Sequence, residues 1–130
     1  MPVRSLSSSV LKWPDAREVV AAVQRWAERK AREHPEVVRI GYLGSYARGD
    51  WGVGSDVDLL ILVEHSGVPF EGRGAQWAPD ELPVPADVLV YTLAEWQSLP
   101  REGRFYRTVM REAVWVWERG TGESRGQPEE

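Results

Sequence analysis

The chain has 130 residues, of which 42% are hydrophobic and 28% charged, a composition that is ordinary for one folded domain and excludes a disordered or fibrous protein. Its net charge of -4, without a lysine–arginine block, excludes an extended nucleic-acid-binding surface as its main feature. There is no cysteine for disulfides or thiolate metal sites, no signal-peptide pattern in the first residues and no membrane-spanning apolar run, so we expect a cytoplasmic protein.

The first predicted element is an amphipathic helix that begins near Pro14 and ends at Glu33. Apolar residues recur at helical spacing in this stretch, namely Ala16, Val20, Val23, Ala27 and Ala31. Proline suits the first turn of a helix, and Pro35 requires the helix to end before it. We expect the charged residues of this helix to form a solvated face, and the serine-rich residues 1–13 to be a mobile segment.

A strand from Val37 to Leu43 is predicted next, because VVRIGYL is rich in strand-forming residues. It runs into a sharp turn at Gly44, after which residues 45–50 are compatible with a short helical turn. Where a strand leads into a helix, the free backbone N–H groups of the first helical turn point out of the helix N-terminus, toward any ligand bound there. Gly44 and Ser45 are therefore candidates to bind a phosphate, since glycine allows close approach and a serine hydroxyl can donate a hydrogen bond.

Two acids open the following strand, which is predicted from Asp56 to Val63. Because alternate residues of a strand share a face, Asp56 and Asp58 point the same way, and both faces become apolar after Asp58. This pattern is typical of a central strand with its acids at one end. Two carboxylates this close raise each other's pKa unless a cation neutralises them, and oxygen ligands favour Mg²⁺. The alternative is that Asp56 caps the strand and Asp58 is solvated.

A long loop is predicted from Glu64 to Pro85, because this segment contains three glycines and four prolines. The strand that follows, Ala86 to Tyr91, carries a third acid at Asp87. If this strand lies beside the one that begins at Asp56, then Asp87 completes a group of three carboxylates. The alternative is a polar strand end near a loop.

The remaining elements are short. Thr92 and Glu95 form a capping-box pattern that begins a helix ending before Pro100. A second helix is predicted over residues 101–112 and a last strand over residues 114–117. We expect residues 14–118 to form the domain and the polar residues 119–130 to be a disordered tail.

Three further residues lie near the predicted site. Arg48 could stabilise phosphate charge, although a surface ion pair with Asp50 or Glu64 is the simpler interpretation. Trp51 and Trp77 could stack on an adenine, but a tryptophan in a loop more often covers apolar surface.

The stretch GSYARGDWGVGSDVDLLILV resembles the signature of the minimal nucleotidyltransferases of the DNA polymerase β superfamily, in which Gly-Ser is followed by ten residues and then by Asp-x-Asp leading into a hydrophobic strand. The resemblance covers about residues 14–118. It implies an α/β (α+β) two-layer fold with a mixed sheet and helices packed mainly on one face. It also implies that Gly44 and Ser45 bind nucleotide phosphates and that three catalytic acids hold two Mg²⁺, namely Asp56, Asp58 and Asp87. Asp87 would help to deprotonate the attacking hydroxyl.

Minimal members of this family often pair with an all-helical HEPN toxin and act as its antitoxin by transferring AMP to one of its tyrosines. The resemblance therefore implies transfer of AMP from ATP to a hydroxyl of a HEPN-type partner. Two alternatives stay open: an antitoxin that acts by contact alone, and a nucleotidyltransferase that modifies a small molecule or an RNA end. Many relatives carry a helix between the second and third acids, where this chain has its Gly/Pro-rich segment. A homo-oligomer is compatible with the sequence.

Overall fold

The computed structural model describes residues 14–77, 79 and 81–120 of the chain. The segment predicted to be mobile, 1–13, and the tail from 121 onward lie outside the described residues. The elements are α2 (Ala16–Glu33), β1 (Val37–Leu43), α3 (Ser45–Arg48), β2 (Val57–Val63), α4 (Phe70–Gln76), β3 (Ala86–Thr92), α5 (Leu93–Gln97), α6 (Arg104–Glu112) and β4 (Val114–Glu118).

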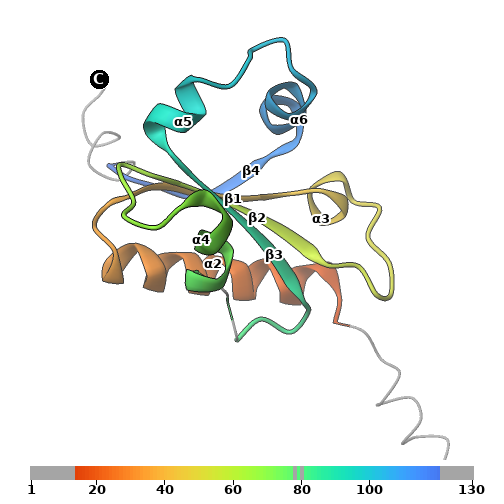
Figure 1. Cartoon of the computed structure of the whole chain (residues 1–130). Helices are drawn as coiled ribbons and strands as arrows, with labels where there is room; N and C mark the ends of the chain where they lie inside the picture. Colours follow the sequence, from red (N-terminus) through yellow and green to blue (C-terminus); the bar gives the residue numbers. More distant parts are fainter. Residues whose placement is uncertain (1–13, 78, 80, 121–130) are drawn as a thin grey trace, which may run out of the picture.

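The four strands form one mixed sheet in the order β3-β2-β1-β4. Strand β1 is antiparallel to β2 and to β4, whereas β2 and β3 are parallel. Figure 1 shows α2 along one face of the sheet and α5 and α6 over the other. The predicted α/β class with a mixed sheet is confirmed, as is the central place of the strand predicted from Asp56, which begins at Val57 in the structure. Helices lie over both faces of the sheet and not mainly over one, because both faces of the central strand are apolar and need covering.

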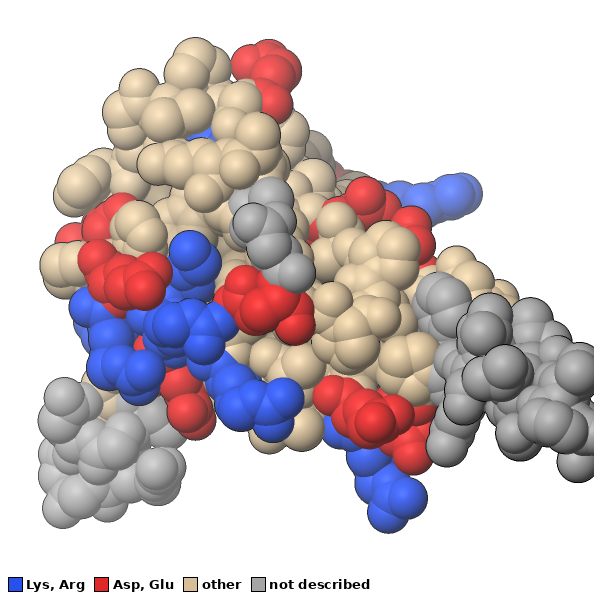
Figure 2. Space-filling view, turned by 90° about the horizontal axis from the view of Figure 1, so that it is seen from below, with Lys and Arg blue, Asp and Glu red and all other residues tan. Residues whose placement is uncertain are grey.

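Helix α2 begins with a capping box, which the sequence analysis did not identify. The Asp15 carboxylate accepts a hydrogen bond from the Glu18 N–H (2.9 Å), and the Glu18 carboxylate accepts one from the Asp15 N–H (3.0 Å). The helix buries Val19, Ala22, Val23, Trp26 and Ala27. Figure 2 shows the exposed side of this region, where basic side chains gather over the C-terminal half of α2 with acidic ones among them.

The core has two parts because β2 is apolar on both faces. Val57, Leu59, Ile61 and Val63 pack with α2 in the larger cluster of buried residues, while Leu60 packs with Val109 of α6 in the smaller one. Asp58 and Leu60 are two residues apart along β2, so their side chains lie on the same face of the sheet, which is the face that α6 covers.

The predicted loop from Glu64 to Pro85 is wrong in part, since residues 70–76 form helix α4. Its stability comes from distant partners of Arg73, which is 5% exposed. The Arg73 guanidinium donates to both carboxylate oxygens of Glu95 (2.6 and 3.1 Å) and to the carbonyl oxygens of Val68 (2.7 Å) and Val90 (3.1 Å). A Cβ at Gly74 would lie 3.3 Å from the Val88 carbonyl oxygen, so glycine here allows α4 to approach β3 closely. These tertiary contacts outweigh the poor helix propensity of the segment.

The C-terminal elements agree with the prediction, including the capping box of Thr92 and Glu95 that begins α5. Arg119, in the segment predicted to be a tail, contacts the domain: its N–H donates to the Val38 carbonyl and its side chain pairs with Glu64. Within the part of the chain that the structure describes, no helix has both the length and the apolar character needed to cross a bilayer.

Candidate active site

Asp58 and Asp87 are direct neighbours across the parallel pair of strands β2 and β3. Each is the second residue of its strand, so both carboxylates lie at the same end of the sheet and on the same face. Asp58 is half-buried and Asp87 is exposed. The two strands are therefore neighbours, as a shared site that contains Asp58 and Asp87 requires.

The environment of Asp58 disfavours its negative charge. Burial raises the pKa of the Asp58 carboxyl, and the negative charges of Asp87, Asp56 and Glu112 raise it further, against a smaller opposing effect of Arg48. No described residue donates a hydrogen bond to the carboxylate of Asp58 or of Asp87. A cation bound between the two would remove this electrostatic cost.

Asp56 lies just before β2 and is exposed. Among the described residues, no three histidine or acidic side chains are placed so that they could hold one metal ion. The structure thus brings together a pair, Asp58 and Asp87, with Asp56 near enough to act on Asp58 through its charge. Two carboxylates suffice for Mg²⁺ when substrate phosphates supply further oxygen ligands, so the donor set fits this ion.

Gly44 connects β1 to the single turn of α3 and lies against the Asp58 carboxylate. Its backbone has φ 82° and ψ -151°, a region open essentially to glycine alone, and a side chain at this position would collide with the Asp58 side chain. No side chain caps α3. The predicted phosphate-binding residues Gly44 and Ser45 therefore adjoin the carboxylate pair.

Arg48 is held by two carboxylates. Its Nε lies 3.0 Å from Asp50 Oδ2 and its Nη1 lies 3.1 Å from Glu112 Oε2, and hydrogen bonds to Asp50 and Glu112 raise the pKa of the guanidinium. The expected ion pair with Asp50 is confirmed, whereas Glu64 pairs with Arg119 instead. Glu112 was missed by the sequence analysis, because 64 residues separate it from Arg48 and no local pattern marks it.

The carboxylate pair opens onto a groove of about 570 Å³ along β3. The groove is large enough for a small ligand. It is lined by Asp58, Gly74, Ala86, Asp87, Val88 and Leu89.

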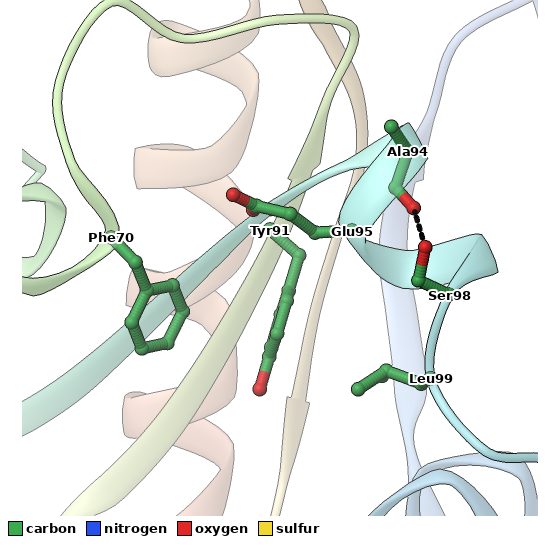
Figure 3. A pocket seen from close by; sticks show the side chains of 6 residues that line it. All are labelled: Phe70, Tyr91, Ala94, Glu95, Ser98 and Leu99. Atoms are coloured by element: carbon green, nitrogen blue, oxygen red, sulfur yellow. Dashed lines mark hydrogen bonds between the residues drawn. The ribbon is translucent and has the colours of Figure 1, made fainter.

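A second hollow, of about 470 Å³, lies between α4 and α5. Figure 3 shows the Phe70 and Tyr91 rings and the Leu99 side chain around it. The Glu95 carboxylate is occupied by Arg73, and the Ser98 hydroxyl donates to the Ala94 carbonyl (3.0 Å). The hollow therefore offers apolar surface and the Tyr91 hydroxyl, without a free charge.

The two loop tryptophans pack against neighbouring rings. Trp51 stacks on Tyr46, with 5.7 Å between ring centroids, and Trp77 is 3% exposed with its ring 4.4 Å from that of His34. These contacts favour the interpretation that both cover apolar surface.

A family model described as "Nucleotidyltransferase domain" matches residues 24–116. No curated protein matches the chain. A candidate nucleotidyltransferase from Sulfolobus solfataricus has a similar structure, with a TM-score of 0.59, 19% identity and coverage of 82% of this chain and 86% of its own.

Two toxin–antitoxin structures are also similar in fold. One is a complex with AMP-PNP, with a TM-score of 0.53, 16% identity and coverage of 77% of each chain. The other is a mutant MntA–HpeT pair, with a TM-score of 0.51, 14% identity and coverage of 77% of this chain and 76% of that one.

Proposed function

This chain belongs to the nucleotidyltransferase domain family, and on that basis we propose that it transfers AMP from ATP to a hydroxyl of a partner protein. The observation that carries the proposal is the pairing of Asp58 with Asp87 across β2 and β3, beside the close approach of Gly44. A nucleotidyltransferase needs a place for the nucleotide phosphates next to acids that hold a metal, and these residues provide both.

Each residue has a defined task in this proposal. Gly44 and Ser45 bind the phosphates, Asp58 and Asp87 together hold one Mg²⁺, and Asp56 beside them contributes to a second. When bound, Mg²⁺ neutralises charge that develops on the transferred phosphate and on the leaving oxygen. The acceptor oxygen forms a bond to the α-phosphorus, the bond to pyrophosphate breaks, and the exposed Asp87 takes the hydroxyl proton. Arg48 can add positive charge once it leaves its present carboxylate partners.

The proposed acceptor is a tyrosine of an all-helical HEPN-type protein, so that the chain acts as an antitoxin. This rests on the resemblance of residues 44–63 to minimal nucleotidyltransferases, and it is supported by the likeness to a toxin–antitoxin complex with AMP-PNP. We further propose a cytoplasmic location, where ATP is available and where a chain without cysteine needs no disulfide.

The test is label transfer from α-labelled ATP to a HEPN-type protein, with and without Mg²⁺. We expect Asp58→Asn to abolish the transfer, and Glu28→Gln on the exposed side of α2 to retain it. Undiminished transfer by Asp58→Asn would overturn the proposal. If the wild-type chain labels nothing, yet both it and Asp58→Asn neutralise the toxin, the contact-only alternative holds. Added RNA or small hydroxyl compounds test the remaining alternative.

A further inference from the structure

Helix α6 has an inward side and an outward side of different character. Phe105, Val109 and Glu112 recur at helical spacing on the inward side, where Val109 is 1% exposed and packs in a cluster with Leu60. The outward side carries exposed residues only, namely Arg104, Arg107, Met110 and Arg111. The outward side is therefore not needed for the core.

Positive charge is concentrated here without ionic partners. Residues 101–111 contain four arginines and one glutamate, a net charge of +3 in a chain of net charge -4. Of the twelve described arginines, six make no ion pair with a described carboxylate, and four of these six belong to this segment. A groove of about 340 Å³ runs along them, lined by Glu102, Arg104, Arg107, Thr108 and Arg111. The other two arginines without an ion pair to a described carboxylate, Arg25 and Arg32, lie on α2, which also carries Glu28 and Glu33.

Apolar side chains lie next to these arginines. Met110 is 59% exposed, and Val114, four residues further along, is 39% exposed. They are two of the four large hydrophobic residues exposed in the described part of the chain. Methionine and arginine are enriched in protein–protein interfaces, whereas lysine and glutamate are depleted. The composition is thus that of an interface with an apolar centre and a positive rim.

This surface adjoins the candidate active site through α6 itself. On the inward side, the Glu112 Oε2 atom lies 3.1 Å from Nη1 of Arg48 in α3, and the negative charge of Glu112 raises the pKa of Asp58. A protein bound to the outward side of α6 would lie one helix diameter, roughly 10 Å, from the residues that contact Glu112, and could extend past the helix to present its hydroxyl at the nucleotide site.

We propose that this surface, made of Arg104, Arg107 and Arg111 around Met110 and Val114, docks the acceptor protein through an apolar patch ringed by carboxylates. The inference rests on the proposed function and names the surface by which the partner is held. A protein fits better than RNA because Met110 and Val114 offer nothing to phosphates. The Tyr106 ring is not free for base stacking, since Arg101 covers it and Trp96 packs 5.5 Å away.

The experiment measures affinity for the HEPN-type protein that serves as acceptor in the label-transfer test. A triple variant, Arg104→Glu with Arg107→Glu and Arg111→Glu, should bind at least about 30-fold more weakly than wild type, because charge reversal opposes the carboxylate rim. Met110→Glu should also weaken binding. The control, Arg25→Glu with Arg32→Glu, removes the unpaired arginines of α2 and should keep wild-type affinity. Milder variants, Arg107→Ala and Met110→Ala, serve if the triple variant does not fold.

Each outcome decides the inference. Equal affinity of the triple and wild-type chains overturns it, as does the absence of any complex with the wild-type chain. If the triple variant loses binding to an RNA oligonucleotide but keeps wild-type affinity for the protein, the surface binds RNA and the inference is also overturned. Label transfer is scored separately. A wild-type chain that binds its partner but transfers no AMP leaves this surface standing while the proposed function fails.

Discussion

Gly44 and Asp58 are packed so closely that a Cβ on Gly44 would displace the Asp58 carboxylate from its place beside the turn after β1. The turn that would hold phosphates and the acid that would hold the metal are thus fixed relative to each other by the sheet, in which Leu43 and Asp58 are register partners. Such fixed placement is what transfer chemistry requires of its binding groups.

Gly44→Ala should lower the free energy of unfolding by more than about 2 kcal/mol, because the new methyl group adds a collision to backbone strain. The matched control is Gly49→Ala. Gly49 also has positive φ (88°) but has no atom within 4 Å of a new Cβ, so its cost should be about 1 kcal/mol of strain alone. Urea unfolding of both variants checks the difference. Equal costs would show that Gly44 does not approach Asp58 in solution.

Asp58→Asn should stabilise the fold at neutral pH while it abolishes transfer. The folded-state pKa of Asp58 is raised, so the ionised group destabilises the native state at pH values above that pKa, and the penalty disappears as the pH falls through it. The amide removes the penalty at every pH. The gain should be under about 1 kcal/mol, since the group is half-buried and partly screened. Urea midpoints at pH 7.5 and at a pH below the ordinary carboxyl pKa of 3.8 should differ less for the variant than for wild type.

Glu112→Gln should tighten ATP binding by about threefold to tenfold, the scale of one charge interaction, because it releases Arg48 from one of its two carboxylate partners and removes a negative charge that raises the pKa of Asp58. Asp50→Asn is the matched control. It releases Arg48 from the other carboxylate, but Asp50 is not among the charges that raise the pKa of Asp58, so it should tighten binding less. Calorimetric titration with a non-hydrolysable ATP analogue measures both. Weaker binding by Glu112→Gln would mean that the ion pair positions Arg48 for the nucleotide.

Arg73→Ala should cost about 2–4 kcal/mol of unfolding free energy, because it removes the four hydrogen bonds that this buried guanidinium donates, two to the Glu95 carboxylate and one each to the Val68 and Val90 carbonyl oxygens. Arg73→Lys should restore little, since an ammonium cannot replace the bidentate contact. For comparison, Arg29→Ala removes an exposed ion pair with Glu81 and should cost less than about 1 kcal/mol. Denaturant unfolding gives all three values. A small effect of Arg73→Ala would show that α4 does not depend on this arginine.

Local patterns were sufficient to predict α2, the strands and the start of α5, because apolar periodicity and capping residues act within a few positions. They failed for α4, whose stability depends on Glu95 and on a carbonyl of β3. Within the site, the acids were found from spacing, but the pairing of Asp58 with Asp87 depends on how β2 and β3 align. Glu112 could not be found, since its contact with Arg48 exists only in three dimensions.

Glu95 has one further consequence. Its carboxylate caps α5 through the Thr92 N–H and at the same time anchors α4 through Arg73, and these contacts lower its pKa. Two helices on separate stretches of the chain therefore share a single negative charge. They should exchange their amide hydrogens as one cooperative unit, and protonation of that carboxylate should loosen both helices around the hollow between them (Figure 3).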